Sequence, residues 1–134
     1  MLVFVNGCFD VLHRGHFELL KFARELGTYL VVAIDSDTRV QEMKGSDRPF
    51  FNQSDRKFAL ESNRWVDEVH VFDCAEQLTQ LTAIFQPAII VVGSDYRDKP
   101  VIGSENAKEI RFFERIPNYS TTQILQSSPN RRKL

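Results

Sequence analysis

Residues 2–35 read LVFVNGCFDVLHRGHFELLKFARELGTYLVVAID and predict a strand, a helix and a second strand in succession. The first strand is the apolar run from Leu2 to Val5. Apolar residues then recur at intervals of three and four between His16 and Leu26, which predicts a helix, and Gly27 ends it. The run from Tyr29 to Ile34 is apolar throughout, which is typical of a strand covered on both faces of a parallel sheet.

The same alternation continues to the end of the chain. We expect helices over 54–64, 75–85 and 120–125, and strands over 69–72, 88–92 and 110–113. The polar stretch from Gln41 to Asn52 predicts a loop of about a dozen residues, a length that is usually functional in a compact domain. The order of elements predicts an α/β fold, a Rossmann-like three-layer domain with a parallel sheet of about five strands. Ligands bind such sheets beyond the carboxyl ends of the strands, where the strand order reverses.

Length and composition limit the alternatives. With 134 residues, 43% hydrophobic and 26% charged, the chain predicts one globular domain over residues 1–127, followed by a basic flexible tail over 128–134. The tail carries three basic and no acidic groups, so the rest of the chain is acidic and we expect no nucleic-acid partner. No apolar run approaches the roughly 18 residues of a membrane span. The N-terminus lacks a basic region, so we expect no signal peptide and a cytoplasmic protein.

The loop after the first strand carries the strongest chemical signal. The glycines of the chain fit neither G-x-G-x-x-G nor the P-loop spacing. Instead, His13 and His16 flank Gly15 at the start of a predicted helix, where unpaired backbone N–H groups favour an anion. Both histidines can donate hydrogen bonds to phosphate oxygens, so we predict a polyphosphate site. Their spacing is also compatible with zinc or with two ordinary surface histidines, and these alternatives stay open on the residues alone.

Three segments carry a resemblance to a known family. Residues 7–16, GCFDVLHRGH, resemble the H-x-G-H nucleotide-binding loop of the cytidylyltransferase-like nucleotidyltransferases. Residues 93–96, GSDY, resemble the family's G-x-D-Y turn, and residues 115–122 resemble its R-T-x-G-I-S-T-T segment. Ile116 and Asn118 depart from that last pattern. Each segment follows a predicted strand, and together they span nearly the whole chain.

The resemblance implies an enzyme that transfers a nucleoside monophosphate from ATP or CTP to a sugar phosphate and releases pyrophosphate. The domain that acts on heptose 1-phosphate is the most similar branch, and glycerol-3-phosphate cytidylyltransferase, which makes CDP-glycerol, is the alternative. The resemblance further implies Mg²⁺ bound mainly through nucleotide phosphates, no metal site made by the protein itself, and a homodimer. A non-catalytic nucleotide sensor and an interaction module that uses the basic tail are the alternatives from other classes.

Specific residues are assigned from chemistry and resemblance together. Arg115 can offer a planar donor fork to phosphate, and Lys44 stands in the expected loop as a mobile cation. Arg56 is expected in the first turn of a helix, beside a positive dipole end, which suggests that it serves a ligand. The expected catalytic residues are His13, His16, Lys44 and Arg115. The expected nucleotide-binding residues are Gly7, Cys8, Phe9, Asp10, Gly15, Gly93, Asp95, Ser120, Thr121 and Thr122. The expected substrate-binding residues are Asp37 and Arg56.

Overall fold

The computed structural model describes residues 1–114, 120, 122, 124 and 125 and contains a five-stranded parallel sheet. The strand order is β3-β2-β1-β4-β5, which confirms the predicted fold class. The strands are β1 (Leu2–Gly7), β2 (Tyr29–Asp35), β3 (Glu68–Phe72), β4 (Ile89–Gly93) and β5 (Glu109–Phe113). The chain moves outward from β1 in one direction and returns to β4 on its other side. The strand order therefore reverses between β1 and β4.

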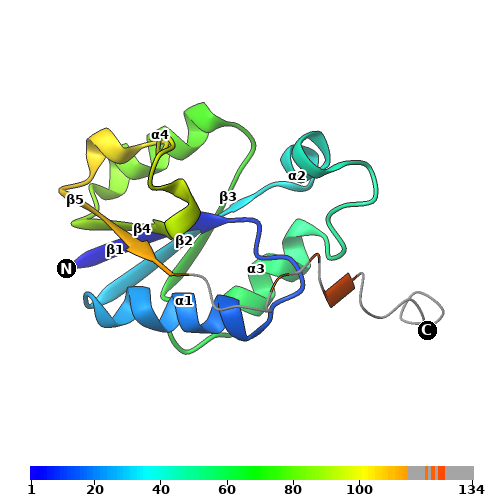
Figure 1. Cartoon of the computed structure of the whole chain (residues 1–134), viewed down its shortest axis with the longest axis horizontal. Helices are drawn as coiled ribbons and strands as arrows, with labels where there is room; N and C mark the ends of the chain where they lie inside the picture. The colour runs from blue at the N-terminus through cyan, green and yellow to red at the C-terminus, as the bar shows by residue number, and fades with distance from the viewer. Residues whose placement is uncertain (115–119, 121, 123, 126–134) are drawn as a thin grey trace.

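Helices cover both faces of this sheet, as Figure 1 shows. They are α1 (Arg14–Glu25), α2 (Asp37–Lys44), α3 (Gln53–Glu61) and α4 (Ala75–Phe85), with single 3₁₀ turns η1 (Ser94–Tyr96) and η2 (Ser104–Asn106). Helices α1 and α3 pack on one face and α4 packs on the other. The arrangement is the expected three-layer domain.

The alternation of side chains along the strands divides the core into two parts. Val3 and Val5 of β1 point to the face covered by α1 and α3, and the intervening Phe4 points to α4. On the first face, Leu20 of α1 and Leu60 of α3 are buried against the sheet. A strand that is buried on both faces reads as a continuous apolar run, which is why β1 and β2 were visible in the sequence.

The predicted loop over 41–52 is wrong in its first part. Residues up to Lys44 belong to α2, and the loop begins only at Gly45. Ser36 caps this helix, since its hydroxyl accepts a hydrogen bond from the N–H of Arg39 at 3.2 Å. Only Val40 is buried in α2, so the helix has almost no apolar stripe by which periodicity could detect it.

Smaller differences concern helix ends. Helix α1 begins at Arg14 with His13 as its N-cap, two residues before the expected start. Helix α3 begins at Gln53, because Asn52 caps it by accepting from the N–H of Asp55 at 2.9 Å.

Near the C-terminus, three described residues are helical: Thr122, Ile124 and Leu125. The N–H of Ile124 donates to the carbonyl of Ser120 at 3.0 Å, in agreement with a helix start near Ser120. Arg115, Thr121 and the expected tail over 128–134 lie outside the described residues. Within the described part of the chain, no helix has the length and apolar character needed to cross a membrane.

Candidate active site

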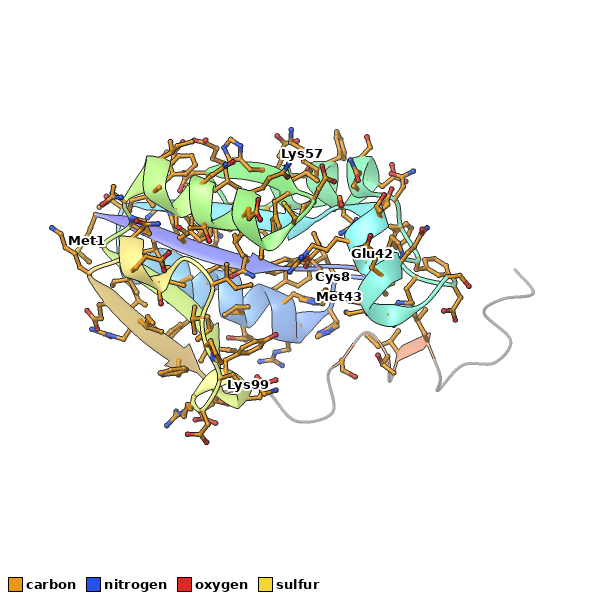
Figure 2. All side chains as sticks on the ribbon, turned by 90° about the horizontal axis from the view of Figure 1, so that it is seen from above. Met1, Cys8, Glu42, Met43, Lys57 and Lys99 are labelled. Carbon is orange, nitrogen blue, oxygen red and sulfur yellow. The ribbon has the colours of Figure 1, made fainter. Side chains whose placement is uncertain are left out.

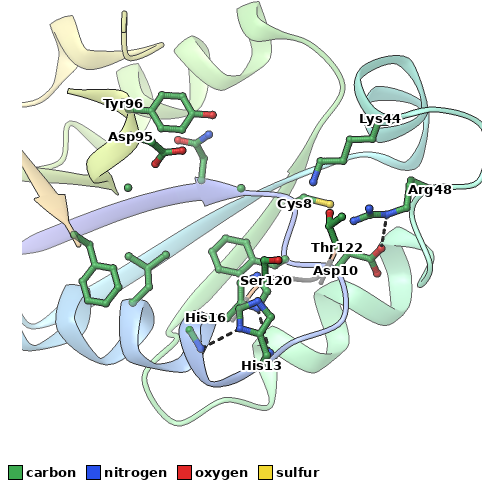
Figure 3. A pocket seen from close by; sticks show the side chains of 17 residues that line it. Cys8, Asp10, His13, His16, Lys44, Arg48, Asp95, Tyr96, Ser120 and Thr122 are labelled. Carbon is green, nitrogen blue, oxygen red and sulfur yellow. Dashed lines mark hydrogen bonds and ion pairs between the residues drawn. The ribbon is translucent and has the colours of Figure 1, made fainter. Parts of the chain in front are cut away.

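A pocket of about 320 Å³ opens at the carboxyl ends of β1 and β4, where the strand order reverses. This is the position that the α/β fold predicts for a ligand. Figure 3 shows the side chains around it. Twelve of the expected site residues line it: Gly7, Cys8, Phe9, Asp10, His13, Gly15, His16, Lys44, Gly93, Asp95, Ser120 and Thr122. Segments that are up to about 115 positions apart in the chain thus meet in one cavity, as the parallel-sheet topology requires.

The two histidines form a reciprocal cap at the start of α1. Nδ1 of His13 accepts a hydrogen bond from the N–H of Gly15 at 3.0 Å, and Nδ1 of His16 accepts from the N–H of His13 at 3.2 Å. An accepting Nδ1 carries no proton, so each ring in its neutral form carries its proton on Nε2. The ring centroids are 4.0 Å apart. The cap therefore orients two imidazole Nε2–H donors at one edge of the pocket.

The loop that leads from β1 to this cap has a strained backbone. Phe9 and Val11 have φ angles of 53° and 50°, in the left-handed region that a β-branched residue such as Val11 rarely occupies. Gly7 precedes them, and a Cβ on Gly7 would lie only 3.0 Å from the ring of Phe9. Strain of this kind is typical of loops that hold a ligand and is maintained by the surrounding packing.

The wall of the pocket at β4 and β5 consists of two aromatic rings and one carboxylate. Asp95 and Tyr96 of η1 line the pocket together with Phe113 at the end of β5. Gly93 allows the turn to close, because a Cβ at this position would lie 2.7 Å from Oδ1 of Asp95. Aromatic rings with one carboxylate suit a nucleoside better than they suit its phosphates.

The opposite wall is cationic. The side chain of Lys44, at the last position of α2, extends toward Cys8, and Arg48 lines the pocket from the loop that follows (Figure 3). Arg48 was not among the residues assigned to the site, although it stands in the stretch from Gln41 to Asn52 that was expected to be functional. Figure 2 shows Cys8 beyond the end of β1, with α2 at the same end of the sheet.

Burial raises the pKa of the Cys8 thiol, and the nearby positive charge of Lys44 acts in the opposite direction. A raised pKa favours the neutral thiol near pH 7, the form that is a poor nucleophile, and Cys8 lines the pocket.

Asp10 is 1% exposed and organises the loop that carries Arg48. Its carboxylate accepts hydrogen bonds from the N–H groups of Phe50 and Phe51, at 2.5 and 2.9 Å. Asp10 was expected to bind nucleotide, and these contacts show that it also connects the β1 loop to the loop before α3.

The two residues expected to bind substrate do not line this pocket. Arg56 is 2% exposed, and its guanidinium donates to the carbonyls of Cys8, Asp35 and Phe51 and to the carboxylate of Asp37, at distances between 2.8 and 3.0 Å. In this structure, Arg56 therefore lies outside the pocket and serves protein acceptors, and its predicted contact with a ligand stays a prediction. A positive charge in the first turn of a helix is unfavourable, and the hydrogen bonds of Arg56 to protein acceptors offset this cost. These hydrogen bonds connect the ends of β1 and β2 to α3. Asp37 lies in a separate hollow of about 280 Å³ beside α3.

The described residues of the pocket form no ready metal site. Among residues 1–114 and the few described beyond them, no three His, Cys, Asp or Glu side chains gather in a way that could hold a metal ion. The Nδ1 atoms of His13 and His16 are engaged in capping, which opposes the zinc alternative for this pair.

Comparisons with known proteins agree with this geometry. The family model described as cytidylyltransferase-like matches residues 4–127. The bifunctional protein HldE of Helicobacter pylori strain G27 is 46% identical over 125 residues, and the protein of the same name from a Nitratiruptor species is 44% identical. Both alignments cover 93% of this chain, and the chain spans only 27% of the length of either relative.

Two solved structures share the fold. The lipopolysaccharide core biosynthesis protein from Thermoplasma volcanium GSS1 aligns with a TM-score of 0.67 at 25% identity, over 90% of this chain and 98% of that one. Pantothenate synthetase from Thermus thermophilus also aligns with a TM-score of 0.67, at 18% identity, over 98% of this chain and 63% of that one, which shows the fold alone. The resemblance predicted from three short segments is confirmed over most of the sequence. The chain belongs to the cytidylyltransferase-like family of nucleotidyltransferases.

Proposed function

We propose that this chain transfers a nucleoside monophosphate from a nucleoside triphosphate to a sugar phosphate of the heptose 1-phosphate class. In this reaction, an oxygen of the acceptor phosphate attacks the α-phosphorus. The bond from the α-phosphorus to the bridging oxygen of the β-phosphate breaks, and pyrophosphate leaves with that electron pair. No covalent enzyme intermediate is needed, so catalysis rests on positioning and on stabilisation of charge.

The observation that carries the proposal is the reciprocal cap of His13 and His16. Each Nδ1 is held by a backbone N–H, so that the Nε2 donors are oriented before any ligand arrives. Donors that are already in place stabilise charge on phosphate oxygens without reorganisation in the transition state. The N-terminus of α1 adds backbone N–H groups and the positive end of its dipole.

The other groups have complementary roles. Asp95, Tyr96 and Phe113 provide the wall suited to the nucleoside. Ser120 and Thr122 line the pocket, and Figure 3 shows Ser120 near His16 and Thr122 on the side of Cys8 and Asp10. Their hydroxyls suit the β- and γ-phosphates, and Lys44 offers a compact ammonium. From the resemblance, Thr121 is proposed for the same phosphates, and Arg115 is proposed, together with Lys44, for the charge that develops in the transition state. Mg²⁺ held through phosphate oxygens would neutralise part of the triphosphate charge. Among the described residues, the carboxylate of Asp95 lines the pocket and could accept from water bound to such an ion, whereas both oxygens of Asp10 already accept from backbone N–H groups.

The sugar phosphate is proposed from similarity. The relatives named HldE are similar over 93% of this chain, and the structure from Thermoplasma volcanium is titled a lipopolysaccharide core biosynthesis protein. Five segments also resemble the heptose 1-phosphate branch in sequence, namely residues 6–10, 44–45, 48–49, 93–96 and 101–105. The base of the nucleotide, the homodimer and the cytoplasmic location remain predictions.

Glycerol-3-phosphate cytidylyltransferase is the second candidate, favoured by one observation. The spacing of Arg115 to the Ser120-Thr121-Thr122 triplet is more similar to that enzyme than to the heptose branch.

The test is pyrophosphate release by the purified chain, measured with each of the four nucleoside triphosphates against a panel of sugar and polyol phosphates. The proposal expects release to require both an aldose 1-phosphate and one nucleotide. Release with glycerol 3-phosphate and CTP would select the second candidate. Tight nucleotide binding without release for any acceptor would instead indicate a nucleotide sensor.

A further inference from the structure

A second cation, Arg48, lines the pocket beside Lys44, and the part of the chain that the structure describes leaves two of its hydrogen-bond donors without acceptors. The side chain of Arg48 is only 13% exposed. Its Nε and Nη2 atoms are shielded from solvent, and no described residue accepts a hydrogen bond from either. By contrast, Arg56, which is more deeply buried with a side chain only 1% exposed, donates to four protein acceptors. Arg48 is thus a partly buried guanidinium at the pocket wall, and its two shielded donors find no acceptor among the described residues.

The nearby carboxylate of Asp10 does not supply acceptors for these two donors. Its Oδ2 lies 3.7 Å from Nε of Arg48, which is close enough for an ion pair and too long for a hydrogen bond. Both carboxylate oxygens instead accept from the backbone N–H groups of Phe50 and Phe51. Asp10 therefore balances the charge of Arg48 and fixes the loop that carries it, but does not satisfy its N–H groups.

The chemistry of these donors defines the missing ligand. A guanidinium presents N–H groups in a planar fork, and this fork matches two oxygens of a phosphate. A shielded donor without an acceptor destabilises the folded protein, and an oxyanion bound in the pocket would remove that cost. Arg48 is thus suited to a phosphate group that occupies the pocket only in the complex.

The position of Arg48 in the pocket indicates which phosphate group it would bind. In Figure 3, Asp95 and Tyr96 lie at one side of the pocket, Arg48 lies at the opposite side, and His13 and His16 lie below. In-line displacement places the attacking and leaving oxygens on opposite sides of the α-phosphorus. If the nucleoside lies against Tyr96 and the leaving phosphates lie against the histidines, one side of the pocket remains for the attacking phosphate. This is the side that carries Arg48.

We propose that Arg48 binds the phosphate group of the sugar phosphate acceptor and presents one of its oxygens to the α-phosphorus, an inference that rests on the proposed nucleotidyl transfer. Two phosphate oxygens accept from the guanidinium, and a further oxygen is left for attack. Asp10 is then a positioning residue, because its carboxylate balances the positive charge of Arg48 and fixes the loop that carries Arg48.

The test is the effect of Arg48→Lys on steady-state kinetics and on nucleotide binding. This substitution keeps a positive charge beside Asp10 and removes the planar fork. We expect KM for an aldoheptose 1-phosphate to rise by about tenfold or more. The Kd for a non-hydrolysable nucleoside triphosphate analogue, measured by calorimetry, should stay within about twofold. Arg39→Lys is the matched control, since Arg39 also pairs with a carboxylate, that of Asp35 at 2.7 Å, but lies outside the pocket.

The possible results separate this inference from the proposed function. If the wild-type chain releases pyrophosphate and Arg48→Lys keeps the acceptor KM, the proposal for Arg48 is wrong while nucleotidyl transfer stands. A weaker Kd for the nucleotide analogue with an unchanged acceptor KM would assign Arg48 to the triphosphate and overturn the proposal. If the wild type releases no pyrophosphate with any acceptor, nucleotidyl transfer itself fails.

A measurement on the wild-type chain covers the case in which Arg48→Lys does not fold. The shielded Nε–H of Arg48 should give a slowly exchanging ¹⁵N resonance. With the nucleotide analogue already bound, addition of the aldoheptose 1-phosphate should shift this resonance. A resonance that responds to the analogue alone, and not to the sugar phosphate, would overturn the proposal.

Discussion

Replacing Arg56 by Met should destabilise the protein strongly, and the structure allows the magnitude to be worked out. The guanidinium is 2% exposed and makes four hydrogen bonds, to three backbone carbonyls and to Asp37. Methionine retains an unbranched apolar stem but lacks the guanidinium, so the substitution removes the donors of all four hydrogen bonds. Removing one partner of such a buried charged network costs about 3–5 kcal/mol. The side chain of Asp37 is 33% exposed, so water replaces part of its lost partner, and the lower half of this range is expected.

The loss is large against a total stability of about 5–15 kcal/mol for a domain of this kind. We expect the Tm to fall by roughly 10–15 °C. Thermal unfolding followed by circular dichroism, with urea unfolding as a second probe, measures the change. Arg64→Met is the matched control, because Arg64 is exposed, and its Tm should stay within about 2 °C of the wild type.

The same variant distinguishes a structural arginine from a ligand-binding one. Two of the carbonyls that Arg56 holds, those of Cys8 and Phe51, belong to the loops around the pocket. Activity should therefore fall together with stability. A variant that keeps the wild-type Tm and only raises KM for the acceptor would refute this reasoning and restore Arg56 as a substrate-binding residue.

Three further predictions concern residues that line the pocket. His13→Ala and His16→Ala should each lower turnover by about 10² or more, and His13→Ala should also cost about 1 kcal/mol because the N-cap of α1 is lost. His13→Asn should restore the cap but not the turnover, and wild-type turnover in this variant would contradict the phosphate role of the imidazole. Lys44→Ala should lower turnover strongly and Lys44→Arg should restore it only in part, since a planar fork does not replace a compact ammonium; a fully active Lys44→Ala would exclude the role. Because burial raises the pKa of Cys8, iodoacetamide should modify it slowly near pH 7 and faster as the pH rises toward that pKa, in a Cys74→Ser background. Lys44→Ala should slow this modification further, and a faster rate would show that Lys44 does not act on the thiol.

The segments near strand ends could be identified from the sequence because their signals are local. The H-x-G-H pattern falls where an apolar run ends and a helical period begins, so the first strand, the helix after it and the position of the histidines were correct. The order of the strands along the chain was also correct, whereas helix α2 was missed. The fold class followed from the same alternation, since strands buried on both faces have nearly continuous apolar sequences.

The roles of the histidines were only partly visible in this way. Spacing placed His13 and His16 at a helix start, but it did not show that they cap the helix reciprocally, with Nδ1 atoms turned to the backbone. That arrangement depends on the extended backbone of His13 and on the strained residues before it.

Local sequence was thus sufficient for the parallel sheet, its helical layers and the histidine loop, because hydrophobic periodicity and capping act between residues that are close in the chain. The tertiary structure alone decided the roles of the arginines. Arg48 and Arg56 stand eight positions apart in equally polar surroundings, yet one has unused donors at the pocket and the other has all its described contacts inside the protein. The difference depends on Cys8, Asp10 and Asp35, which the sheet brings to them from distant parts of the chain. Electrostatic and hydrogen-bonding partners of this kind are determined by which residues lie close together in the folded chain. No local pattern in the sequence records that proximity.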